Sequence, residues 1–347
     1  METKRKKKKN RFILWLVLTI VFSFMVGVGV WAVDFVNDIK NPDWSVSNSP
    51  SASVPGVSLA PGQSQYDEVK PSQDPNYDKL EFGKDVLNIL VMGYDSNEYR
   101  EDSGFVVYRT DALILCTVYF NENKVVMTSV PRDSYVPIGP DFVRKDKINS
   151  AFSSAQTARI DPYQATCKTV SRLFGNVPID YYISIDMDVF ADAIDALGGI
   201  EYDVDVEVAY NGKVLVPMGK KVLNGWEALQ YVTFRKTQNG DIDRVARQRK
   251  FIMAAFSQLK SFDKIMKLPE IYSMLMDRMS TNLTYKQIMS LAVFAMNDLD
   301  SESISGSTFP GSFLTMNGVS YWNINQRERV LLVHKLFHVT IQPDEQD

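Results

Sequence analysis

The stretch that decides the fold runs from residue 86 to residue 133 and reads VLNILVMGYDSNEYREDSGFVVYRTDALILCTVYFNENKVVMTSVPRD. It contains three apolar segments of strand length, at 86–94, 111–120 and 125–130, rich in β-branched residues. NENK at 121–124 is a turn signal, so we expect the second and third segments to form an antiparallel hairpin. With the helix-like segments that follow, this predicts an α/β protein, a mixed central β-sheet flanked by helices.

Polar side chains stand at the ends of these three predicted strands. Asp95 follows the first strand, Asp111 opens the second, and Arg132 and Asp133 follow the third. If the first strand runs parallel to the third, all four residues gather at one edge of the sheet, where open α/β sheets bind ligands. Two carboxylates and an arginine suit a cation such as Mg²⁺ that bridges phosphate oxygens. Taken singly, Asp95 also fits a turn residue, and Arg132 and Asp133 fit a surface ion pair.

The segments after residue 147 alternate between helix and strand patterns. KINSAF at 147–152 leads into a helix-like stretch, and residues 180–204 read as a strand, a helix, a glycine turn and a second strand. Residues 223–235 begin like a helix capped by Asn224 and run into an extended segment.

A further helix is predicted at 240–259, because early aspartates precede apolar residues at helical spacing. Arg244, Arg247 and Gln248 fall near its first turns, where the helix dipole favours anions. A solvated basic face is the alternative interpretation of these residues.

The N-terminus predicts a membrane anchor. Residues 12–33 are an uncharged run of 22 residues, about 33 Å of helix, enough to cross a hydrocarbon core of about 30 Å. The basic cluster within residues 1–11 predicts a cytoplasmic N-terminus and places the rest of the chain outside the cell. A cleaved signal peptide is the alternative, although its apolar region is usually shorter. Residues 34–80, rich in Pro, Ser and Asp, predict an extended extracellular tether.

The formal net charge of −4 hides a split along the chain. Residues 1–36 carry seven basic and two acidic groups; subtracting these from 38 and 42 leaves 31 basic and 40 acidic groups, a net charge of −9, for residues 37–347. A body this acidic argues against nucleic acid as a partner, because non-specific affinity comes from basic groups that meet phosphates. Any bound phosphate must therefore be met by a few arginines or by a metal ion.

The cysteines and histidines point to no chemistry of their own. Two cysteines exclude a disulfide scaffold and a four-cysteine zinc site, and we expect both Cys116 and Cys167 in the core. His334 and His338 have the i, i+4 spacing of zinc ligands, but the residues between them lack the glutamate of a zinc protease. We interpret them as ordinary helix residues, which leaves a Ser-His-Asp hydrolase without a base.

Several of these segments together resemble the LytR-CpsA-Psr family of cell-wall assembly proteins in Gram-positive bacteria. The stretches that carry the resemblance, in chain order, are NILVMGYDS, YRTDALIL, SVPRDSYVPI, KDKINSAF, DALGGIEYDV, LNGWEALQYV and NGDIDRVARQRK, over about residues 85–260, with FPGSF and NGVSYW within 309–322. The anchor and the tether match the usual organisation of the family.

This resemblance implies a membrane-anchored transferase in the cell membrane, with its catalytic domain outside. The donor would be a glycan such as wall teichoic acid or capsule on an undecaprenyl (polyprenyl) pyrophosphate, and the acceptor a peptidoglycan hydroxyl. The implied cofactor is Mg²⁺, with Mn²⁺ as an alternative because both take oxygen ligands. Matched by residue, Asp95 and Asp111 are metal ligands, Asp241 is the general base, and Arg132 and Arg244 act on the pyrophosphate. The other matched or expected pocket residues are Arg109, Lys147, Asn149, Arg235 and Gln248.

The expected organisation has five parts: a cytoplasmic tail at 1–11, the transmembrane helix at 12–33, the tether at 34–80, a catalytic domain at 81–263 and a C-terminal helical extension at 264–347 that packs on it. A polyprenyl chain also needs an apolar cleft, and we expect residues 186–197 and 250–260 to line it.

One position departs from the family pattern. Thr233 stands where the family commonly has the first arginine of Arg-Phe-Arg, and the lost contact to phosphate is worth about 1.5–3 kcal/mol. Two alternatives stay open: a polyprenyl-pyrophosphate hydrolase, which would use water as the acceptor, and a non-catalytic protein that binds the glycan or the lipid carrier. A transcriptional regulator fits poorly, because eleven residues before the predicted span are too few for a helix-turn-helix and the outer body is acidic.

Overall fold

The computed structural model describes residues 85–94, 107–139, 144–259, 268–276, 278–300 and 302–344. The predicted membrane helix at 12–33, the tether at 34–80 and Asp95 lie outside these residues. Within them, no helix combines the length and apolar character needed to cross a membrane.

The chain divides into two units, residues 1–45 with 284–294 and residues 46–283 with 295–347. In the first unit the structure describes most of α10 (Tyr285–Asn297). Two reciprocal hydrogen bonds cap the start of this helix. The backbone N–H of Thr284 donates to Gln287 Oε1 at 2.8 Å, and that of Gln287 donates to Thr284 Oγ1 at 3.3 Å.

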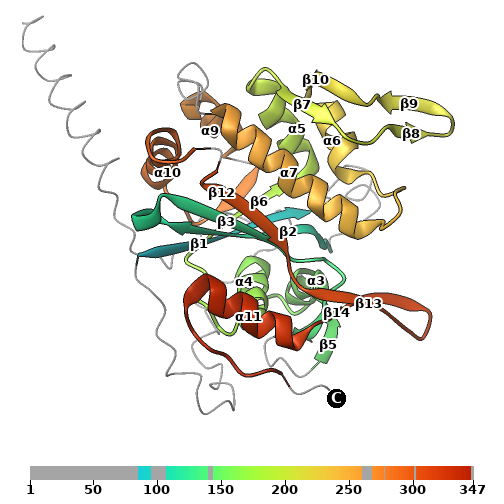
Figure 1. Ribbon diagram of the computed structural model, residues 1–347, viewed down its shortest axis with the longest axis vertical. Helices are drawn as coiled ribbons and strands as arrows, with labels where there is room; N and C mark the ends of the chain where they lie inside the picture. Colours follow the sequence, from blue (N-terminus) through green and yellow to red (C-terminus); the bar gives the residue numbers. More distant parts are fainter. Residues whose placement is uncertain are drawn as a thin grey trace, which may run out of the picture. The chain divides into compact units, whose positions relative to one another are not determined.

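Among the described residues, six strands of the second unit form a mixed sheet in the order β11-β6-β1-β2-β3-β12 (Figure 1). They are β1 (Val86–Tyr94), β2 (Thr110–Tyr119), β3 (Lys124–Ser129), β6 (Tyr181–Asp186), β11 (Met279–Thr281) and β12 (Ile304–Thr308). β2 is antiparallel to β1 and β3, so β1 and β3 run in the same direction. The predicted mixed sheet and hairpin are confirmed.

The connection between β2 and β3 has four residues, 120–123, as many as the predicted turn at 121–124, but it begins one residue earlier. A 3-10 turn, η2 (Phe120–Glu122), is followed by Asn123 in the left-handed conformation with φ 50°. Asparagine tolerates this conformation better than most residues, so the turn reverses the chain without glycine.

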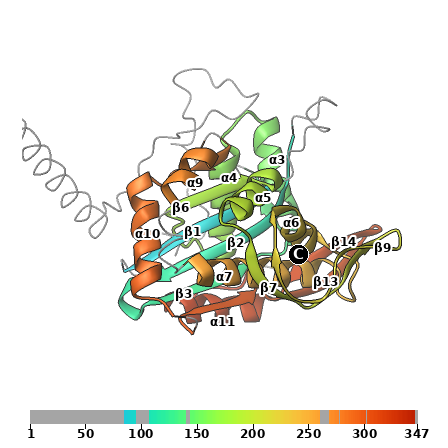
Figure 2. The same ribbon diagram turned by 90° about the horizontal axis from the view of Figure 1, so that it is seen from above.

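Helices cover both faces of the sheet (Figures 1 and 2). On one face lie α3 (Ser150–Thr157), α4 (Pro162–Leu173) and α11 (Gln326–Phe337). On the other lie α5 (Met187–Ala196), α6 (Gly225–Thr233), α7 (Asp241–Leu259) and α9 (Leu268–Leu275). The predicted α/β/α arrangement is confirmed, and the capping box of Asn224 with Glu227 begins α6 as expected.

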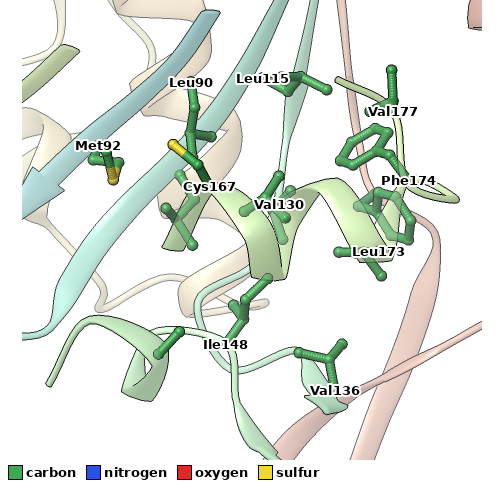
Figure 3. Packing of buried hydrophobic residues seen from close by; sticks show 14 of the residues in the cluster. Leu90, Met92, Leu115, Val130, Val136, Ile148, Cys167, Leu173, Phe174 and Val177 are labelled. Carbon is green, nitrogen blue, oxygen red and sulfur yellow. The ribbon is translucent and has the colours of Figure 1, made fainter. Parts of the chain in front are cut away.

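Each face has its own buried core. Figure 3 shows Leu90, Met92 and Leu115 of the sheet packed with Cys167 and Phe174 in and after α4. The second core joins α5, α6, α7 and α9 through residues that include Val189, Ile194, Tyr231 and Phe251. Val189, Ile194 and Phe251 belong to the segments expected to line a lipid cleft, and their side chains pack in this core.

Four two-stranded ribbons lie outside the main sheet in the described part of the chain. They are β4 (Tyr135–Ile138) with β5 (Arg144–Lys147), β7 (Ile200–Val204) with β10 (Gly219–Leu223), β8 (Val208–Tyr210) with β9 (Lys213–Val216), and β13 (Gly311–Met316) with β14 (Val319–Ile324). The β8–β9 and β13–β14 hairpins project on the same side of the unit (Figure 1).

The C-terminal part contributes more than the helical extension expected from residue 264 onward. β11 and β12 form the two edges of the main sheet, where β11 pairs with β6 and β12 pairs with β3. β11 has three residues, too few for an alternating pattern to be recognised in sequence. Residues far apart in the chain therefore complete one sheet.

The cysteines and histidines behave as ordinary structural residues. Cys167 is buried in α4, whereas Cys116 in β2 is half-buried, and burial raises the pKa of both thiols. His334 and His338 are exposed, and His338 ends α11 in the left-handed conformation.

Arg329 ties α11 to α4 and to the chain that follows. The side chain is buried and donates to the carbonyls of Leu173 at 2.7 Å and Arg172 at 3.2 Å, and it pairs with Asp344 at 3.2 Å. We expect Arg329→Ala to lower the free energy of unfolding by about 3 kcal/mol, because buried acceptors left without donors cost about 1–3 kcal/mol each. Chemical denaturation measures this change. Arg327→Ala, an exposed arginine of the same helix, is the matched control; equal losses in the two variants would contradict the assignment.

Candidate active site

Among the described residues, two carboxylates and three guanidinium groups meet where β2 and α7 begin. Asp111 is the second residue of β2 and Asp241 is the first residue of α7. Arg132 follows β3, Arg235 follows α6, and Arg244 lies one turn into α7. Four separate parts of the chain thus supply one cluster.

Asp111 is contacted by all three arginines. Arg132 Nη1 donates a hydrogen bond to Asp111 Oδ1, and this same oxygen lies 3.6 Å from Arg235 Nη2 and 3.9 Å from Arg244 Nη1. Arg244 Nη2 also donates to the backbone carbonyl of Asp111 at 3.2 Å. The start of β2 is therefore held against α7 through Arg244.

Asp241 is contacted by the same three arginines. Its Oδ1 lies 2.7 Å from Arg244 Nη2, 3.5 Å from Arg132 Nε and 4.0 Å from Arg235 Nε. With three cations and two anions, the cluster has an excess of one positive charge. In a body that is acidic overall, this excess makes it a local site for an anion.

Burial differs among the arginines. The Arg244 side chain is 1% exposed, that of Arg132 is 21% exposed and that of Arg235 is 44% exposed. Desolvation lowers the pKa of Arg244 to about 10, although Asp241 opposes the shift, so Arg244 keeps its charge at neutral pH. Desolvation also acts on Arg132, but Asp111 and Asp241 outweigh it and raise the pKa of Arg132.

Several polar atoms of the cluster are buried without a hydrogen bond. Both carboxylate oxygens of Asp241 accept none, and the Nε–H groups of Arg132 and Arg244 donate none. The short ion-pair distance from Arg244 to Asp241 therefore does not have the angles of a hydrogen bond. Buried polar groups in proteins are nearly always bonded. The cluster thus has free donors for phosphate oxygens and free acceptors for a proton or a cation.

The β2–β3 hairpin explains why Asp111 and Arg132 meet. Ile114 pairs with Ser129, and the backbone N–H of Val130 donates to the Leu113 carbonyl at 2.8 Å. Continued beyond the ladder, this register brings the start of β2 beside the residues that follow β3. The sequence-based prediction that Asp111 and Arg132 share one edge of the sheet is confirmed.

The turn before α7 positions Asp241 and Arg244. Gly240 has φ 53°, a conformation that favours glycine, and its carbonyl accepts from the backbone N–H of Arg244 at 3.2 Å. The acidic residue at the first position of the helix is also favoured by the helix dipole.

Arg247 and Gln248, expected to bind an anion, instead hold α7 against the end of α6. Arg247 is buried, donates to the Phe234 carbonyl, and lies 5.8 Å from the Phe234 ring and 6.0 Å from the Tyr231 ring. Gln248 Nε2 donates to the Val232 carbonyl at 3.3 Å. Both contacts fix the segment that carries Arg235.

The other predicted pocket residues take no part in the ion pairs of the cluster. Asn149 is buried, its backbone N–H donates to the Arg132 carbonyl at 3.2 Å, and its Oδ1 has no partner. Lys147 pairs with Asp133 at 2.8 Å. Arg109 is exposed just before β2 and forms no ion pair with a described residue. Lys147 thus contacts the residue that follows Arg132, and neither Lys147 nor Arg109 forms an ion pair with the two carboxylates of the cluster.

Thr233 lies at the end of α6 and faces its own helix. Its hydroxyl donates to the Leu229 carbonyl at 2.7 Å. Thr233 therefore supplies no charge to the cluster. Arg235, two residues later, is the positive side chain that this segment supplies.

The chemistry of the donors fits a hard divalent cation. Asp111 and Asp241 offer carboxylate oxygens, and those of Asp241 accept no hydrogen bond. Within the described part of the chain, no group of three or more His, Cys, Asp or Glu side chains is arranged to hold a metal ion. Mg²⁺ is commonly held by one or two carboxylates, with phosphate oxygens and water as its other ligands, so the carboxylates present fit such an ion.

Comparisons with known proteins find similar chains over most of this sequence. A polyisoprenyl-teichoic acid–peptidoglycan teichoic acid transferase, TagU of Bacillus subtilis (strain 168), is 28% identical over 330 residues, 94% of this chain and 95% of its own. A solved structure of B. subtilis TagV is 27% identical with a TM-score of 0.61 and covers 75% of this chain and 100% of its own. A structure of TagT bound to LI-WTA is 26% identical with a TM-score of 0.58, over 76% of this chain and 96% of its own.

The match also extends over most of the chain at the level of the family. A model of the LytR_cpsA_psr family matches residues 60–337. This range contains the sheet, the helices on both of its faces and every residue of the arginine and aspartate cluster. The chain therefore belongs to the LytR_cpsA_psr family.

Proposed function

We propose that this protein is a transferase that moves a phospho-glycan from a polyprenyl-pyrophosphate carrier to a hydroxyl group of peptidoglycan. The observation that carries the proposal is the cluster of three arginines around two carboxylates, with its excess positive charge and its unbonded buried donors. The names of similar proteins support it, since TagU is called a teichoic acid transferase with peptidoglycan as acceptor, and TagT is bound to LI-WTA.

In this mechanism the arginines bind the pyrophosphate of the donor. Arg244 and Arg132 each contact both carboxylates, so their guanidinium groups are held in place before substrate arrives. Preorganised charges stabilise a transferred phosphoryl group without reorganisation during the reaction. Arg235, the most exposed of the three, meets the substrate from the solvent side.

Asp241 acts as the general base. Its unbonded oxygens accept the proton of the acceptor hydroxyl as that oxygen attacks phosphorus. A new phosphorus–oxygen bond forms to the acceptor, and the bond to the bridging oxygen of the pyrophosphate breaks. Polyprenyl phosphate leaves, and the arginines stabilise the negative charge that develops on it.

A divalent cation, Mg²⁺ or Mn²⁺, completes the proposal. Asp111 would hold it together with Asp95, which lies outside the described residues. When bound, the cation neutralises charge on the phosphoryl oxygens.

The proposed location is the cell membrane, with one N-terminal span and the catalytic part outside the cell. The support is the uncharged run at 12–33 and the basic cluster before it. This location would place the arginine cluster on the side of the membrane where peptidoglycan is found.

Arg132→Ala should remove a guanidinium group that contacts both Asp111 and Asp241 and that binds the pyrophosphate in the proposed mechanism. We expect kcat/KM for transfer to fall at least ~10²-fold, the usual loss for one preorganised donor. Steady-state kinetics with full-length detergent-solubilised protein measure this. Arg278→Ala is the control, since Arg278 is also paired with an aspartate, Asp192, but is exposed. A kcat/KM within twofold of wild type for Arg132→Ala would sink the proposed role.

Asp241→Asn keeps the size of the side chain and removes the base. We expect kcat to fall about 10²–10⁴-fold. The Kd for the pyrophosphate carrier should not rise, because the arginines remain and one negative charge is lost. Single-turnover kinetics and calorimetry separate the two effects. Asp243→Asn, in the same first turn of α7 but bonded to Asn239, is the control. Full activity in Asp241→Asn would assign the base to another group.

Removal of divalent cations should stop transfer reversibly. We expect EDTA to abolish activity and Mg²⁺ to restore it, because the cation neutralises phosphoryl charge that the arginines leave. Asp111→Asn should raise the Mg²⁺ concentration needed for half-maximal activity. Undiminished transfer in EDTA by metal-free protein would show that the arginines suffice without a cation.

A further inference from the structure

Two tyrosines and an ion pair form a second polar surface beside the arginine cluster. Tyr135 of β4 and Tyr321 of β14 are half-buried and have ring centroids 5.0 Å apart at an angle of 65°. Lys147 Nζ lies 5.4 Å from the centre of the Tyr321 ring and 2.8 Å from Asp133 Oδ1. We call Tyr135, Tyr321, Lys147 and Asp133 the tyrosine platform.

The platform is fixed to the arginine cluster through the backbone. Asp133 directly follows Arg132, and its carbonyl accepts from the backbone N–H of Trp322 at 2.8 Å, which fastens β14 to this segment. On the other side, Tyr135 pairs with Lys147 across the β4–β5 ribbon. The platform therefore begins at the residue that directly follows Arg132.

The charge of the platform differs from that of the cluster. Lys147 and Asp133 are similarly exposed, at 21% and 22%, and they neutralise each other. A phosphate gains little from a neutral pair, and an alkyl chain would bury the pair at a cost in desolvation. The pair offers donors and an acceptor to a neutral ligand that carries hydroxyl groups.

We propose that the tyrosine platform binds a pyranose ring of the glycan next to the phosphorus that reacts. A pyranose has an apolar face of C–H groups and a rim of hydroxyls. The tyrosine rings offer apolar faces with polar tips, and Lys147 and Asp133 offer hydrogen-bonding partners for the rim. The inference rests on the proposed function, because the glycan is the part of that substrate which follows the phosphate. The sugar belongs either to the donor or to the acceptor.

The β13–β14 hairpin supplies a matched control. Tyr321 pairs with Leu314, whereas Phe313 pairs with Trp322. Successive residues of a strand face opposite sides, so Phe313 and Tyr321 lie on opposite faces of the hairpin. Phe313 is 60% exposed. Phe313→Ala thus removes an exposed ring from the same hairpin and leaves the platform unchanged.

The test compares three ligands on full-length protein in detergent: a short-chain polyprenyl pyrophosphate, the same carrier bearing a disaccharide, and a peptidoglycan tetrasaccharide acceptor. For Tyr321→Ala we expect an unchanged Kd for the sugar-free carrier. We also expect about a three- to tenfold weaker Kd for the sugar-bearing carrier, or the same rise in KM for the acceptor. A weaker Kd for the sugar-bearing carrier assigns the sugar to the donor, and a raised KM for the acceptor assigns it to the acceptor. Tyr321→Phe should stay close to wild type.

Tyr135→Ala serves as a second variant and keeps the test valid if Tyr321→Ala does not fold, as judged by circular dichroism. Unchanged values for both sugar-containing ligands in a folded variant would overturn the platform and leave the proposed function intact. Equal weakening for the sugar-free carrier would also overturn it, because the platform would then act on the phosphate. Wild-type protein that binds neither carrier would overturn the proposed function and the platform together.

Discussion

The burial of Arg244 is the constraint on which the site depends. Its guanidinium group is almost completely removed from solvent, which is costly for a charge unless partners are arranged around it. Asp241 on the same helix and the Asp111 carbonyl on β2 are those partners. Their positions require the sheet, the β2–β3 hairpin and the turn at Gly240 to be in place. The site of this chain therefore forms only when these parts of the fold are in place.

The same arrangement leaves charge for a ligand. The two carboxylates order the arginines but do not neutralise them, so one positive charge remains in an otherwise acidic body. Arg247 and Gln248 do not contact the carboxylates, but their hydrogen bonds fix the end of α6 and hence the segment that carries Arg235. Arg249 fastens α7 to the sheet by donating to Thr308 Oγ1 at 3.0 Å. The first turns of α7 thus face the site, and its next turns hold it in place.

Much of the fold could be predicted from the sequence where local signals are strong. The three apolar strands, the hairpin, the cap at Asn224 and the meeting of Asp111 with Arg132 follow from apolar runs, turn residues and strand direction. β11 and β12 could not be predicted, because their pairing with β6 and β3 depends on residues far along the chain. Arg247 illustrates the same limit in the site: a basic residue near the start of a helix has the pattern of an anion ligand, yet the nearby Phe234 carbonyl takes its hydrogen bond. The Tyr135–Tyr321 contact has no sequence signal, since the two rings are on ribbons from opposite ends of the folded region.

The central claim is that the arginine and aspartate cluster transfers a phospho-glycan to a hydroxyl acceptor. The most direct test incubates full-length wild-type protein with a polyprenyl-pyrophosphate glycan, a peptidoglycan oligomer and Mg²⁺, and identifies the products by mass spectrometry. The account predicts glycan joined to the oligomer through a phosphodiester, with polyprenyl phosphate released in equal amount. Glycan phosphate beside an unmodified oligomer would show a hydrolase, and intact carrier would show a binding protein; either result would contradict the account.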